Sequence, residues 1–114
     1  MLKKPKISKT KLKRHSRYVV EIDMCAAKNL HDIQCCDQIQ SCHVRHNFFT
    51  MSRKPAKREL PMCAHHHLRQ HSIGEPAFWG ELMEDAVLLC VELWEISGDV
   101  EGGRWLVTNF QRNS

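Results

Sequence analysis

The chain has 114 residues, of which 42% are hydrophobic and 26% are charged, and its formal net charge is +4. This length allows one small domain with one modest core, and the composition is that of a globular protein rather than a disordered tail. The longest apolar run is too short to span a bilayer, and Met1-Leu2 is followed by lysines rather than by a signal peptide. We therefore expect a cytoplasmic protein with reduced thiols, in which six cysteines and eight histidines favour metal binding over disulfides.

The charges are distributed unevenly along the chain. Residues 1–17 carry eight lysines or arginines and no acid, whereas residues 75–101 carry eight acids and no lysine or arginine. A basic front half predicts a polyanionic partner, in particular nucleic acid. The alternative is that the basic N-terminus is only a solvated arm.

The first part of the chain predicts an arm, a strand, a helix and one arm of a hairpin. Residues 1–17 are typical of a flexible basic arm, and the β-prone residues 18–22 indicate a short strand. Apolar residues at helical spacing predict an amphipathic helix over 23–34, with Asp23 as its N-cap. Residues 39–44 then suit one arm of a hairpin.

The second part of the chain completes a hairpin and adds helices. A basic loop over 45–59 leads to the second arm at 60–62, where Pro61 indicates an edge strand. A helix follows from His65 and stops near Gly74. The helical tail has its clearest helix over 84–97, ended by Gly98, and a last short helix around residues 105–110, with all three tryptophans expected in the core. The predicted fold is α+β and mainly helical: a ββα core over about 35–74 and a helical tail over 75–114, within one domain spanning 18–114.

The histidines and cysteines suggest two kinds of metal site. His67 and His71 lie one helical turn apart, so that both imidazoles can hold one ion. Cys63 and His66 have the short spacing of half a zinc site. The residues alone leave two alternatives: a closed structural zinc site, or an open site that holds a divalent ion against a phosphate while His43 activates water.

Several motifs in order resemble the phage and prophage HNH-type endonucleases of the ββα-metal class. The similarity covers roughly residues 24–100 and is carried by His43-Val44-Arg45, Arg53-Lys54-Pro55, Leu60-Pro61-Met62-Cys63, His66-His67 with His71, and Gly74-Glu75-Pro76-Ala77-Phe78-Trp79. The resemblance implies a metal-dependent endonuclease that hydrolyses DNA phosphodiester bonds in a bacterial or phage-infected cell. It implies no membrane partner.

The resemblance also implies a role for each matching residue. His43 would be the general base, and His67 and His71 would hold a catalytic ion, Mg²⁺ or Mn²⁺ or else Zn²⁺. A structural zinc ion would be held by Cys63 and His66 with thiols from Cys35 and Cys36. The cations that would meet DNA are Arg45, Arg53 and Lys54.

The chain departs from the family pattern at two points. Cys35 and Cys36 are adjacent where the family has Cys-x-x-Cys, so that one of them paired with Cys42 is an alternative ligand pair. The acid or amide expected after Lys-Pro is absent, and Glu59 or Asn47 would have to replace it. A zinc-stapled DNA-binding module without activity is therefore the second hypothesis, and a redox or metal sensor using the thiols of Cys35, Cys36 and Cys42 is the third.

The remaining histidines and cysteines predict ordinary structural positions. Cys25 and Cys90 suit the core better than a metal site. His15, His31 and His65 are expected at the surface. Glu75 is expected to cap a turn or pair with a base rather than to bind metal.

Overall fold

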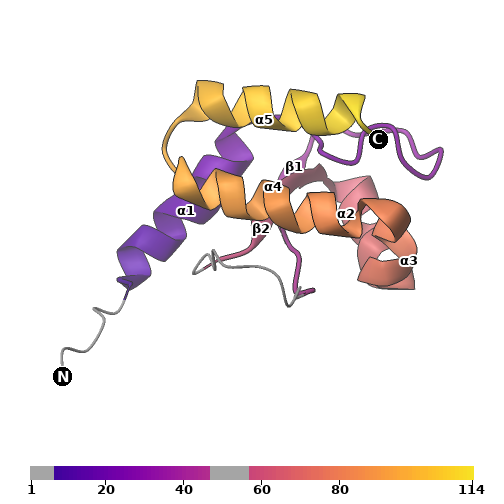
Figure 1. The fold of residues 1–114 in the computed structure, drawn as a ribbon, viewed down its shortest axis with the longest axis horizontal. Coiled ribbons are helices and arrows are strands. Elements are labelled where there is room, and N and C mark those ends of the chain that lie inside the picture. The colour runs from indigo at the N-terminus through magenta and orange to yellow at the C-terminus, as the bar shows by residue number, and fades with distance from the viewer. Residues whose placement is uncertain (1–6, 47–56) are drawn as a thin grey trace.

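The computed structural model describes residues 7–46 and 57–114. Five α-helices and a two-stranded antiparallel sheet make up this part of the chain, which confirms a mainly helical α+β fold (Figure 1). The elements, in order, are α1 (Lys9–Glu21), β1 (Ile39–His43), β2 (Glu59–Cys63), α2 (Ala64–Ile73), α3 (Glu75–Trp79), the 3₁₀ turn η1 (Gly80–Leu82), α4 (Met83–Glu95) and α5 (Val100–Arg112).

Helix α1 occupies most of the range that the sequence predicts as a flexible arm and a strand. Ser8 caps it by accepting a hydrogen bond from the backbone N–H of Lys11 at 3.1 Å. One face carries His15, Tyr18 and Val19, which are all buried, while the cations point to solvent. The prediction of an arm is therefore wrong from Lys9 onward, and so is the strand over 18–22. Burial of an apolar stripe at helical spacing outweighs the β preference of the valines.

The segment between α1 and β1 is an irregular loop rather than the helix predicted over 23–34. Asp23, His31 and Asp32 have left-handed φ angles of 55°, 61° and 54°, which no α-helix contains. The loop is tied to the sheet by the backbone N–H of Ala26, which donates to the carbonyl of Pro61 at 2.8 Å. This loop carries two cysteines to the site described below.

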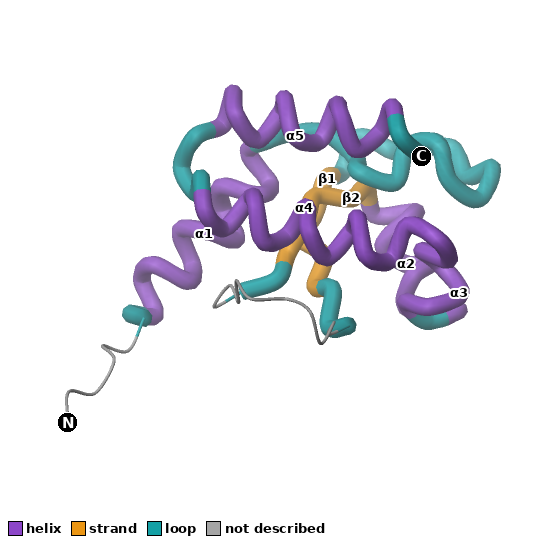
Figure 2. The backbone as a smooth tube through the Cα atoms, viewed as in Figure 1, coloured by secondary structure: helices purple, strands orange, loops and turns teal. Residues whose placement is uncertain are grey.

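The hairpin forms as the sequence predicts. The register runs from Ile39 opposite Cys63 to His43 opposite Glu59. Helices surround the two short strands (Figure 2), and every residue of β2 is buried. Side chains of β1 and β2 alternate between a face toward α1 and a face toward α2.

The C-terminal helices follow the predicted order, with differences in detail. Gly74, with a φ angle of 86°, is the C-cap of α2. Helix α4 ends at Glu95 with Ile96 as its C-cap, and Gly98, with a φ angle of 100°, lies in the turn that follows. Of the tryptophans, Trp79 is buried, Trp94 is half-buried and Trp105 is 67% exposed, so the expectation of three core tryptophans is wrong for Trp105. Within residues 7–46 and 57–114, no helix has the length and apolar character needed to cross a membrane.

The packing of α1 is testable with one matched pair of substitutions. Ile22, at the end of α1, is fully buried, whereas Val20 is 38% exposed. Ile22→Ala should lower the free energy of unfolding by about 2–5 kcal/mol because it leaves a cavity in the core. Val20→Ala should lower the free energy of unfolding by clearly less. Urea unfolding measures both, and equal small effects would mean that α1 is not part of the cooperative fold.

His15 is buried, contrary to the expectation of a surface histidine. Its Nδ1 lies 2.7 Å from the hydroxyl of Ser97, its Nε2 has no hydrogen-bond partner among the described residues, and its ring packs edge-on against Trp94. Burial lowers the pKa of His15. The unfolded chain, with an ordinary histidine pKa of about 6.5, therefore binds the proton more readily than the folded protein does.

Stability should consequently fall as the pH drops below about 6.5. His15→Phe keeps a ring in this place and removes the titration, so its unfolding free energy should decrease less between pH 7 and pH 5 than that of the parent. Denaturant titrations at several pH values give this slope. If the unfolding free energy changed equally with pH in both proteins, His15 would not contribute to the pH dependence of stability.

Candidate metal centre

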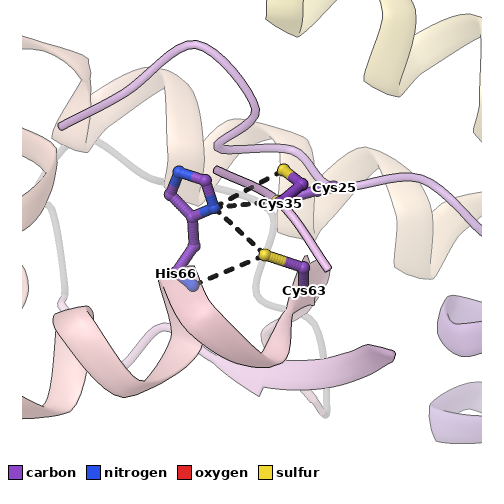
Figure 3. A group of neighbouring side chains, drawn as sticks. All are labelled: Cys25, Cys35, Cys63 and His66. Carbon is purple, nitrogen blue, oxygen red and sulfur yellow. Dashed lines mark hydrogen bonds between the residues drawn. The ribbon is translucent and has the colours of Figure 1, made fainter. Parts of the chain in front are cut away.

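Four potential metal ligands converge at one point beside the junction of β2 and α2. Cys25 and Cys35 come from the loop after α1, Cys63 ends β2, and His66 lies in the first turn of α2 (Figure 3). Their donor atoms all lie within 4.8 Å of one another. Cys25, Cys63 and His66 are buried, and Cys35 is half-buried.

The start of α2 aims His66 at the three sulfurs. Cys63 is the N-cap, and its Sγ accepts a hydrogen bond from the backbone N–H of His66 at 3.5 Å. At the other edge of the ring, Nε2–H donates to the carbonyl of Leu30 at 3.0 Å. Because this bond holds the proton on Nε2, the lone pair of Nδ1 points toward the sulfurs. Carbonyl acceptors orient metal-binding histidines in the same way.

The distances from the nitrogen to the three sulfurs are compatible with a tetrahedral ion. The Nδ1 atom of His66 lies 3.1 Å from Cys63 Sγ, 3.6 Å from Cys35 Sγ and 3.7 Å from Cys25 Sγ. Tetrahedral zinc, at its usual distances of about 2.3 Å to sulfur and about 2.0 Å to nitrogen, places the nitrogen about 3.5 Å from each sulfur. A single lone pair cannot accept hydrogen bonds from three thiols at once, whereas one cation can bind all four donors. The donor set is thus compatible with a Cys₃His zinc site.

Burial gives this group the character of a structural site. It raises the pKa values of the Cys25 and Cys35 thiols, so that a metal ion must displace their protons. Binding should accordingly weaken at low pH. An open hollow of about 490 Å³, lined in part by Cys25, Cys35 and Cys36, leads from solvent to the sulfurs and offers an entry path for the ion.

The zinc ligands predicted from the sequence agree only in part with the four residues that the structure brings together. Cys35, Cys63 and His66 lie in the group, as the sequence predicts, and Cys25 joins them although it was expected in the core. Cys36 lies outside, with its Sγ 4.0 Å from the carbonyl of Gln38, because adjacent side chains of the loop diverge. Cys42 is buried elsewhere and accepts a hydrogen bond from Gln70 at 3.1 Å. Cys25 was missed because its partners are distant in the sequence, so no ligand spacing marks it.

His67 and His71 form a second, more exposed pair on α2. Their Nε2 atoms lie 3.0 Å apart, near the roughly 3.3 Å that a shared tetrahedral ion would impose on two imidazole nitrogens. The Nδ1 of His67 lies 2.8 Å from the side-chain oxygen of Gln40 on β1, which suits an Nδ1–H donor and leaves Nε2 as a ligand. Burial, then the neighbouring His71 and His43, lower the pKa of His67 and favour its neutral, metal-binding form.

His43 lies at the open end of the hairpin with a carboxylate behind it. Its side chain is 55% exposed, and its Nε2 lies 3.5 Å from Oε2 of Glu59, which is only 2% exposed. The other carboxylate oxygen accepts a hydrogen bond from the hydroxyl of Ser16 at 2.8 Å, and the ammonium of Lys57 lies 3.7 Å away. A solvent-facing imidazole backed by a fixed carboxylate is an arrangement that general bases use.

The predicted DNA-contacting residues are placed only in part. Arg45 is exposed beside His43, and its backbone N–H donates to the carboxylate of Glu75, which therefore caps the segment after β1 as expected. Arg53 and Lys54 lie outside the described residues, as does Asn47. His65 is exposed, as expected, and its Nδ1 lies 2.9 Å from the carbonyl of Gln34.

Two neighbouring cysteines provide a matched test of the metal centre. Cys35→Ser removes a donor from the group, whereas Cys36→Ser alters the next residue and leaves all four donors in place. We expect the parent and Cys36→Ser to be purified with one zinc ion per chain, and Cys35→Ser to retain much less and to unfold at lower denaturant concentration. Elemental analysis of dialysed protein measures the stoichiometry. Equal zinc content in both variants would contradict the assigned ligand set.

The assignment of a candidate metal site rests on the donor atoms and their geometry. No family model, curated protein or solved structure matches the chain.

Proposed function

We propose that the protein is a zinc-stapled, metal-dependent endonuclease of the HNH type that hydrolyses DNA phosphodiester bonds. The observation that supports this most is the pair formed by exposed His43 and buried Glu59 at the open end of the hairpin. The carboxylate restrains the imidazole and stabilises the imidazolium that forms when His43 takes a proton from water. Glu59 thereby supplies the acid that the sequence pattern lacks after Lys54-Pro55.

His67 and His71 are the proposed ligands of a catalytic divalent ion. Their converging Nε2 atoms offer two of its ligands, and water and a phosphate oxygen would complete the shell. Such an ion, Mg²⁺ or Mn²⁺ in the proposal, would supply charge stabilisation at the scissile phosphate. The buried Cys₃His group is separate from this pair and would hold the hairpin, the loop and α2 in place.

Helix α1 adds a basic surface for the DNA backbone. Its exposed side chains include five cations, at positions Lys9, Lys11, Lys13, Arg14 and Arg17. Because the same helix supports Glu59 through Ser16, the basic surface and the His43–Glu59 pair belong to one side of the hairpin. Phosphate contacts of this kind position a duplex without reading its sequence.

A second candidate function is DNA binding without hydrolysis. Strand alternation directs His43 toward the face covered by α1, whereas Gln40, three residues earlier, contacts His67 on the face covered by α2. A phosphate would have to bridge the edge of the hairpin to meet both the base and the ion. A protein that only binds DNA has no such requirement.

Plasmid nicking distinguishes the two functions. With Mg²⁺ or Mn²⁺, the purified protein should convert supercoiled plasmid to the open circle, and His43→Ala should slow this by roughly 10²- to 10⁴-fold while DNA binding is retained. Glu59→Gln should also slow nicking, since the imidazolium that forms at His43 loses its counter-charge.

His65→Ala is the matched control, because His65 is an exposed histidine of α2 outside the His67–His71 and His43–Glu59 pairs. It should nick like the parent. A parent that binds DNA without nicking it would favour the second candidate. Equal nicking by the parent and by His43→Ala would remove His43 from the mechanism.

A further inference from the structure

Helices α4 and α5 lie side by side (Figure 1). Two hollows of about 350 and 570 Å³ share Leu88, Trp105 and Leu106 and so form one continuous groove. Leu88 is 43% exposed and Trp105 is 67% exposed, so two large apolar side chains of this groove face solvent. On α5 the lining residues Gly102, Trp105, Leu106 and Asn109 recur at the spacing of one helix face.

The rim of this groove is acidic. Four carboxylates line it, those of Asp85, Glu92, Glu95 and Asp99, and no lysine, arginine or histidine is among its lining residues. The surrounding sequence has the same sign, since residues 75–101 contain eight acids and no lysine or arginine. An apolar floor with a single-sign acidic rim is complementary to a segment that is both apolar and basic.

The charges disfavour two other occupants. The acidic rim repels a nucleic acid backbone, so this groove cannot extend the basic surface of α1. A symmetric dimer through the groove would bring the acidic rims of two copies together, and like-charge contacts are destabilising.

We propose that the groove between α4 and α5 is a docking surface for a basic amphipathic helix of another protein. Leucine-sized side chains of that helix lie against Leu88, Trp105 and Leu106, and its lysines or arginines pair with the rim. This is the helix-in-groove mode of recognition, with apolar anchors one turn apart. The proposal does not depend on nuclease activity, because the groove residues belong neither to the metal centre nor to the His43–Glu59 pair.

A synthetic amphipathic helix of leucine and lysine, labelled for fluorescence anisotropy, tests the proposal on the full chain. It should bind with one-to-one stoichiometry, its affinity should fall as salt is raised, and the emission of Trp105 should shift to shorter wavelength as the indole is covered. A peptide with the same leucines and glutamate in place of lysine should bind at least about tenfold more weakly.

Three variants locate the binding. Leu88→Ser and Glu92→Lys should each weaken binding of the lysine peptide roughly tenfold while the circular dichroism is unchanged. Leu68→Ser is the control, because Leu68 is 71% exposed on α2 and does not line the groove. Equal binding of both peptides, or equal losses in all three variants, would overturn the proposal. A parent dimer that Leu88→Ser dissociates in sedimentation experiments would also overturn it, by making a second copy the occupant.

Discussion

The convergence of three sulfurs on Nδ1 of His66 is the constraint on which the rest of this small fold depends. The loop before β1 has no helix or strand, yet it carries Cys25 and Cys35 to the junction of β2 and α2. A chain of this size has a modest core. Structural zinc contributes about 10–16 kcal/mol of apparent binding energy in zinc-finger peptides at pH 7, comparable to the whole stability of an ordinary domain. One ion in this group would therefore fix the loop, the hairpin and α2 together.

The buried Cys₃His group is separate from the more exposed histidines. Adjacent residues of α2 have different surroundings. His66 faces the buried sulfurs, whereas His67 faces Gln40 and His71 near the surface. At the hairpin's open end, His43 pairs with Glu59, which α1 holds in place through Ser16. The same division appears in the charges: basic side chains lie on α1, and carboxylates gather along α4 and the start of α5. Nucleic acid and a basic protein segment would accordingly meet different sides of the molecule.

The sequence predicts best where one local pattern decides the structure. The edge-strand signal of Pro61, the glycine after α2 and the apolar spacing of α4 correctly predict the hairpin, α2 and α4, whereas α3 was not predicted. Prediction failed between residues 9 and 34, where tertiary contacts override local preference: Val19 packs in a helix, and the left-handed residues Asp23, His31 and Asp32 break the apolar period. Spacing identified Cys63 and His66, which are three residues apart. Sequence spacing could not identify Cys25, because Cys63 and His66 are distant from it in the sequence. Only the path of the loop after α1 brings Cys25 next to them.

X-ray absorption at the zinc edge tests the central claim most directly. In the purified full-length protein, the first shell should contain three sulfur atoms at about 2.3 Å and one imidazole nitrogen at about 2.0 Å. Cys36→Ser should give the same spectrum, and Cys25→Ser should lose one sulfur or the metal altogether. A shell of nitrogen and oxygen only, or a folded protein that binds no zinc, would contradict the assignment of Cys25, Cys35, Cys63 and His66 as the staple of this fold.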